Sequence, residues 1–217
     1  MRTPAAFVFF AIFALGVARA DAPAPKVTAD AALELLTTGN RAFVAAGAAC
    51  PRQSPARRTA VAGAQHPIAV IIGCADSRVP PEAIFGQGIG DLFVVRVAGN
   101  VVDDTVLGSV EYAVEHLGVS LVVVLGHERC GAVEAALADG AAHAHVATIV
   151  GRIRSAIAAA RTQPGDALDN AVRANVAASV NQVRSSKPLL APAVQKGDVK
   201  VVGGRYDLDT GAVEILP

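Results

Sequence analysis

The sequence lacks an excess of charge of either sign, and this absence excludes several classes of partner. It contains 19 Lys and Arg residues against 19 Asp and Glu residues, so its formal net charge is zero. Proteins that bind a phosphate backbone or an anionic membrane surface electrostatically carry a basic excess. We therefore expect no nucleic acid partner.

Long apolar runs are also absent, apart from one near the N-terminus. The run from Ala5 to Val17 follows Arg2 and precedes Ala18-Arg19-Ala20, a small-x-small pattern. It is shorter than the roughly 20 residues that span a bilayer, and the whole pattern is typical of a secretory signal peptide. We predict a signal peptide over residues 1–20 and an exported bacterial protein, periplasmic or secreted after cleavage near Ala20, with no membrane span in the mature chain. The alternative is an uncleaved anchor.

Cysteine is scarce, with three residues in 217. An odd count in an exported chain argues against a disulfide framework and leaves metal ligands or a free thiol to explain. The surroundings of each cysteine decide between these roles.

The remaining composition is that of one globular domain, which we place over residues 21–217. Hydrophobic residues make up 53% of the chain and charged residues 18%, enough apolar material for a sizeable core. Continuous apolar runs at 68–74, 92–98 and 121–127 are typical of strands covered on both faces. The stretch 103–117 has helical spacing behind possible caps, so strand, helix and strand form a parallel crossover. The predicted fold class is α/β, with a mostly parallel sheet flanked by helices.

Further elements follow from local patterns. We expect a first helix capped by Thr28 or Asp30, a loop from Gly47 to about Arg58, a short helix after Gly131, and two further helices near 147–160 and 167–183. Asp209-Thr210-Gly211 predicts a turn between two strands at the C-terminal end of the chain.

Two predicted strands end in potential metal ligands. Cys74 follows the first, and His127 and Cys130 follow the third. Because ligands collect at the carboxyl ends of parallel strands, these side chains converge if the two strands are neighbours. Two thiolates and one imidazole suit Zn²⁺, and three protein ligands leave one position open, as in catalytic sites. Taken alone, the His-x-x-Cys pair is better explained by a buried thiol and a packed histidine, but its position at the end of one predicted strand, matched by Cys74 at the end of another, reverses that preference.

Longer blocks around these residues resemble the β-class carbonic anhydrases. The blocks CADSRVPPE at 74–82 and GHERCGAV at 126–133 are similar to the two signatures of that family, and the likeness continues through 90–100 and 108–119. The resemblance implies reversible hydration of carbon dioxide to bicarbonate and a proton by a zinc-bound hydroxide. It also implies one Zn²⁺ per subunit and a homodimer or higher homo-oligomer.

The resemblance assigns roles to two charged residues. It implies that Asp76 orients the nucleophile and that Arg78 holds this carboxylate by charge-assisted hydrogen bonds. Without Arg78, Asp76 is a possible fourth zinc ligand in a closed state of the site. Without this context, an Asp-x-Arg pattern is by default a weak surface salt bridge.

The resemblance also implies a substrate pocket formed by Gln65, Phe93 and Tyr112, partly contributed by a neighbouring subunit. From pattern alone, ordinary core packing is the preferred explanation for Phe93 and Tyr112. Gln65 is carried by plant-type members of the family, and the chain has no Trp, the residue that an inhibitory bicarbonate pocket of the other branch uses. We therefore favour the plant-type branch, with a zinc position open to water.

Other interpretations remain at this stage. Relatives that hydrolyse carbon disulfide or carbonyl sulfide keep the same ligands, and a structural zinc clamp would use Asp76 as a permanent fourth ligand. The interpretation of Cys74 as a nucleophile activated by Arg78 is less favoured, because the loop after Cys74 contains Pro80 and Pro81 and no Gly-rich anion cradle.

Cys50 is expected to be a bystander thiol. Glu128 and Arg129 are a departure, since family members more often carry small or less charged residues there.

Overall fold

The computed structural model describes residues 26–46, 51–138 and 140–217. The predicted signal peptide and Cys50 lie outside the described residues and stay predictions. The elements are α1 (Ala29–Ala46), α2 (Pro55–Val61), β1 (Ala69–Gly73), α3 (Pro81–Ile84), β2 (Leu92–Arg96), η1 (Ala98–Asn100), α4 (Asp104–Leu117), β3 (Leu121–His127), α5 (Gly131–Leu137), α6 (Val146–Ile157), η2 (Ala158–Thr162), α7 (Ala167–Ser185), α8 (Leu190–Lys196), β4 (Lys200–Tyr206) and β5 (Val213–Leu216).

The strands of the described chain form one sheet in the order β2-β1-β3-β4-β5. The first four are parallel, and β5 pairs antiparallel with β4 through the predicted turn. The predicted α/β class with a mostly parallel sheet is therefore confirmed. In this order the strand preceding Cys74 lies directly beside the strand that ends at His127.

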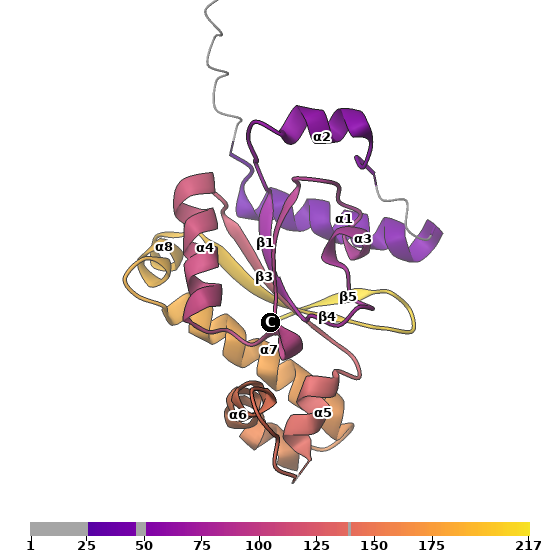
Figure 1. Ribbon diagram of the computed structural model, residues 1–217, viewed down its shortest axis with the longest axis vertical. Coiled ribbons are helices and arrows are strands. Elements are labelled where there is room, and N and C mark those ends of the chain that lie inside the picture. Colours follow the sequence, from indigo (N-terminus) through magenta and orange to yellow (C-terminus); the bar gives the residue numbers. More distant parts are fainter. Residues whose placement is uncertain (1–25, 47–50, 139) are drawn as a thin grey trace, which may run out of the picture.

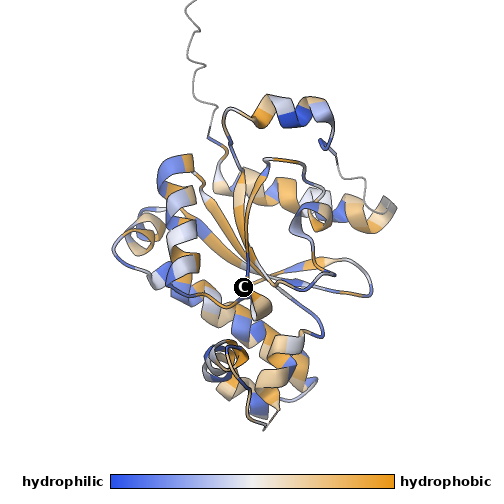
Figure 2. Ribbon diagram, in the orientation of Figure 1, coloured by the Kyte–Doolittle hydropathy of each residue, from blue (hydrophilic) through white to orange (hydrophobic). Residues whose placement is uncertain are grey.

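Both faces of the central strands are covered, as their continuous apolar sequences predict. Every residue of β1 and β3 is buried, and the strands are strongly hydrophobic along their length (Figure 2). Successive side chains of a strand point to opposite faces. Ile71 and Val123 accordingly belong to one core, and Val70 and Val122 belong to the other.

Helices form the outer layers (Figure 1). Helices α1 and α3 contribute to the first core, and α4 and α8 contribute to the second. Helix α7 packs against β3 and β4, and α5 and α6 pack on α7 beyond the sheet. Near the carboxyl ends of β1 and β3, Cys74 and Cys130 are buried, whereas Ala75, Ser77, Arg78 and Arg129 stay exposed.

The boundaries of α4 have local causes. Asp103 accepts a hydrogen bond from the backbone N–H of Val106 at 2.9 Å, which satisfies one free donor of the first turn. Gly118 ends the helix in the left-handed conformation with φ of 69°, which favours glycine. At the start of α1, Thr28 caps the helix by accepting a hydrogen bond from Ala31.

Three short helices depart from the sequence prediction. The segment expected to be a loop as far as Arg58 contains α2, with Ser54 as its cap and Pro55 at its first position. Helices α3 and α8 were not predicted. None of the three exceeds seven residues, and helices this short depend on tertiary packing rather than on a periodic pattern. No helix in the described part of the chain is long and apolar enough to cross a membrane.

Candidate metal centre

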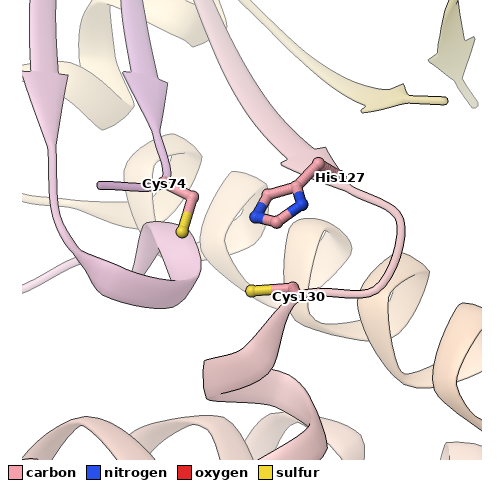
Figure 3. Close-up of side chains that lie close together, drawn as sticks. All are labelled: Cys74, His127 and Cys130. Carbon is pink, nitrogen blue, oxygen red and sulfur yellow. The ribbon is translucent and has the colours of Figure 1, made fainter. Parts of the chain in front are cut away.

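Three predicted ligands converge because the sheet places their strands side by side. Gly73 of β1 is in register with Leu125 of β3, so Cys74 and His127 leave neighbouring parallel strands at the same edge. Cys130 lies immediately before α5. The Cys74 Sγ, His127 and Cys130 Sγ ligand atoms all lie within 4.8 Å of one another and point into one space (Figure 3). Their residues are 4%, 1% and 2% exposed, respectively.

The His127 ring is oriented by the main chain. Its Nδ1 lies 2.7 Å from the carbonyl oxygen of Glu128. A carbonyl only accepts hydrogen bonds, so Nδ1 carries the proton and Nε2 presents its lone pair. Nε2 is buried and has no hydrogen-bond partner. An unpaired buried acceptor facing two thiols fits a metal ligand, and this donor set fits zinc.

The two cysteines shift each other's pKa in opposite directions. A hydrogen bond from the Cys130 thiol lowers the pKa of Cys74, and the backbone N–H groups of Asp76 and Gly99 donate to Cys74 Sγ at 3.4 and 3.2 Å. The same hydrogen bond to Cys74 raises the pKa of Cys130. Because the thiolate is the form that binds a metal, a divalent cation displaces the protons of such thiols when it binds.

Asp76 and Arg78 form a bidentate ion pair beside the cysteines. Arg78 Nε donates to Asp76 Oδ1 at 3.0 Å and Arg78 Nη2 donates to Oδ2 at 2.7 Å, while the Arg78 backbone N–H donates to Oδ1 at 2.9 Å. The Arg78 side chain thereby lowers the pKa of Asp76 to about 2. Oδ2 of this carboxylate lies 3.8 Å from His127 Nε2, so Asp76 borders the ligand cluster while both its oxygens are held by arginine.

Arg96 is a supporting residue to which the sequence analysis gave no role. At the end of β2, its guanidinium donates to the backbone carbonyl of Cys74 at 2.8 Å and to the carbonyl of Asp76. It therefore holds the loop that carries both residues. The block 90–100 contains Arg96, but a charged residue at a strand end carries no local sign of the carbonyls it will meet.

Gly99 supports the same cysteine from the other side. It adopts φ of 69°, and a Cβ there would lie 2.6 Å from Ile153 Cδ1. Its N–H donates to Cys74 and its carbonyl accepts from Asn175 Nδ2 at 2.8 Å. The position requires glycine for both conformation and space.

The three residues predicted to form a substrate pocket do not join the ligand cluster within one chain. Gln65 is exposed and precedes β1, at the end of the strand opposite Cys74. Phe93 and Tyr112 contact each other, with ring centroids 6.2 Å apart. Phe93 pairs in register with Val70, four residues or about 13 Å of strand from Cys74, and Tyr112 is 47% exposed. Their predicted role with a neighbouring subunit stays a prediction.

Glu128 and Arg129, the two charged residues that depart from the family pattern, both bind residues of β4 or of the connection between β4 and β5. Arg129 binds both carboxylate oxygens of Asp209, at 2.9 and 2.7 Å. Glu128 accepts from Arg205 Nη2 at 2.9 Å and from the backbone N–H of Leu208 at 3.1 Å. The loop 127–130, which carries two of the candidate ligands and which we call the metal-binding loop, is thus tied to a hairpin about 80 residues further along the chain.

Comparison with known proteins identifies the family to which this geometry belongs. The sequence matches the family model described as carbonic anhydrase over residues 69–213, which includes all three ligand positions. "Carbonic anhydrase 2" of Mycobacterium tuberculosis is 42% identical over 191 residues, covering 86% of this chain and 92% of the relative. The chain belongs to the β-class carbonic anhydrase family. The carbonic anhydrase of Mycolicibacterium smegmatis is also 42% identical, over 88% of this chain and 95% of that protein.

Solved β-carbonic anhydrases share the fold. The Coccomyxa enzyme, solved in complex with acetazolamide, is 34% identical with a TM-score of 0.67, over 73% of this chain and 75% of that one. A Sordaria macrospora enzyme, from a pair described as tetrameric, is 29% identical with a TM-score of 0.68, over 73% and 84% of the two chains. The predicted family resemblance is confirmed, and the chain is a carbonic anhydrase, an enzyme that hydrates carbon dioxide.

Proposed function

We propose that this carbonic anhydrase is a zinc enzyme with one Zn²⁺ per subunit, held by Cys74, His127 and Cys130. The observation that carries the proposal is the buried, unpartnered Nε2 of His127, directed at the Cys74 and Cys130 thiols within 4.8 Å. When bound by three protein ligands, zinc supplies a Lewis acid that makes water a nucleophile near neutral pH.

The protein prepares this site by hydrogen bonds to its ligands. The carbonyl of Glu128 selects the His127 tautomer, and two backbone N–H groups stabilise the Cys74 thiolate. Such outer contacts orient ligands and tune their basicity. Because all three residues are almost fully buried, competing water is excluded from the ligand atoms.

We assign Arg78 the role of keeping Asp76 away from the fourth ligand position. The bidentate pair occupies both carboxylate oxygens, and an Asp76 with a pKa of about 2 stays ionised throughout the neutral range. An ionised Asp76 is only an acceptor, so it orients the attacking water by accepting its hydrogen bond. This arrangement supports the plant-type interpretation and argues against a structural clamp that uses Asp76 as a permanent ligand.

The first test is removal of the metal. We expect the purified chain to contain about one zinc per subunit and to hydrate carbon dioxide in a stopped-flow assay at pH 7 to 9. A chelator should remove zinc and hydration together, because the nucleophile depends on the metal, and added zinc should restore both. Zinc that is present in stoichiometric amount without hydration would support a structural role instead.

We further propose a homo-oligomer assembled through the β2 edge of the sheet. Within the described chain β2 has a neighbour on one side only, and the Phe93–Tyr112 contact lies beside it with Tyr112 half exposed. An exposed edge strand next to aromatic side chains is a ready pairing surface. Sedimentation should show a dimer or larger species that Tyr112→Arg weakens; a wild-type monomer at all concentrations would contradict assembly.

A further inference from the structure

Glu128 is held by Arg205 of β4 and by Leu208 of the connection between β4 and β5. Its Oε1 accepts from Arg205 Nη2 at 2.9 Å and its Oε2 accepts from the Leu208 N–H at 3.1 Å. Its own backbone N–H donates to the carbonyl of Tyr206 at 3.0 Å. Three hydrogen bonds thus fix one residue of the metal-binding loop against β4 and the turn that follows it.

The main chain of the same residue contacts the metal ligand. The Glu128 carbonyl accepts from His127 Nδ1 at 2.7 Å, so the placement of this carbonyl determines both the proton position and the orientation of the ring. His127 Nε2 then faces Cys74 and Cys130 (Figure 3). Any displacement of Glu128 is transmitted to Nε2 through one hydrogen bond and one peptide unit.

The partner of Glu128 is Arg205, a mostly buried cation with other carboxylate partners. The Arg205 side chain is 12% exposed and also contacts Asp169 and, at 3.5 Å, Asp207. Removal of Glu128 therefore leaves Arg205 with two carboxylates rather than as an unpaired buried charge, the case that is strongly destabilising. Loss of the Glu128 carboxylate should consequently loosen the loop without unfolding the domain.

We propose that Glu128 is a positioning residue that holds His127 in its metal-binding orientation through Arg205 and Leu208. This role rests on the proposed zinc site. Contacts behind a metal-binding histidine typically change metal affinity or activity by 10- to 100-fold. We expect Glu128→Ala to release zinc about 10- to 100-fold faster than the wild type, and Glu128→Gln to lie between them. The glutamine oxygen can still accept from Arg205, whereas its NH₂ group cannot accept from Leu208 N–H.

The experiment measures zinc content and then the rate of zinc transfer from the holoenzyme to a chromogenic chelator. Glu214→Gln is the matched control, since Glu214 binds Arg173 at 3.0 and 2.7 Å, Arg173 shares Asp169 with Arg205, and Glu214 lies opposite Arg205 in the β4–β5 strand pairing. It alters the same charge network without touching the loop. We expect zinc release from Glu214→Gln to stay within about twofold of the wild type. Its thermal stability should fall only slightly, by about as much as that of Glu128→Ala.

The possible outcomes distinguish a failure of the positioning role of Glu128 from a failure of the zinc site. Zinc release at the wild-type rate in Glu128→Ala would overturn the positioning role while leaving the zinc enzyme intact. Equal acceleration by Glu128→Ala and Glu214→Gln would also overturn it, because a general loosening of the network would then be responsible. A wild-type protein that binds no zinc would instead refute the zinc site itself, before any variant is compared.

Discussion

Cys74→Ser is expected to lose zinc and carbon dioxide hydration together, with hydration falling by more than about 100-fold, beyond what loss of an outer contact costs. Cys74 Sγ lies within 4.8 Å of the other two ligand atoms. A serine hydroxyl is a harder and far less acidic donor than a thiol, so it does not replace a thiolate on zinc. The substitution keeps the shape of a residue that is 4% exposed, so the fold should persist.

Zinc content by elemental analysis and stopped-flow hydration on the same samples measure this effect. Cys50→Ser is the matched control, because Cys50 is the one cysteine that we assign no role, and it should keep both zinc and activity. Full zinc occupancy with wild-type hydration in Cys74→Ser would show that the assignment of Cys74 as a ligand is wrong.

Arg78→Met is expected to keep zinc but to lower kcat/KM at pH 7 to 8 by about 10- to 100-fold. The variant removes both side-chain hydrogen bonds that hold the Asp76 carboxylate. Without the guanidinium, the pKa of Asp76 rises from about 2 toward its ordinary value near 3.9. The carboxylate is therefore still ionised at neutral pH, and it is free to take the fourth position beside His127.

Cobalt substitution distinguishes this mechanism from general damage. The visible absorption of bound cobalt reports its ligands, so Arg78→Met should shift the spectrum and Arg78→Met/Asp76→Asn should shift it back, because an amide is a weaker ligand than a carboxylate. Arg78→Lys retains the charge without the bidentate geometry and should fall between wild type and Arg78→Met. Wild-type kcat/KM in a zinc-loaded Arg78→Met protein would contradict the proposal that Arg78 keeps Asp76 away from the fourth ligand position.

The parts of the fold that were predicted correctly rest on local patterns. Uninterrupted apolar runs marked β1 and β3, since strands buried on both faces have no polar positions; the run at 92–98 also marked a strand, but β2 is only partly buried and ends in the exposed Arg96. Asp103 and the helical spacing behind it marked α4. The short helices α2, α3 and α8 carry no comparable pattern, so the first was taken for a loop and the other two were missed.

The candidate ligands could be named from the sequence because their signal is also local. Cys74 and Cys130 follow apolar strands within a few residues, His127 ends one, and the blocks around them are specific to the family. The supporting contacts have no such signal. Arg96 meets carbonyls 20 and 22 residues away, and Glu128 meets Arg205 at a separation of 77 residues.

By itself, the sequence determined the α/β class, the family and the three candidate ligands, because strand periodicity and ligand type are properties of short segments. Tertiary structure alone decided that β1 and β3 are neighbours, that Arg96 holds the loop that carries Cys74 and Asp76, and that the loop 127–130 is tied to the β4–β5 hairpin. Those outcomes depend on which distant segments pack together, and packing is settled by the whole core rather than by any one stretch of chain.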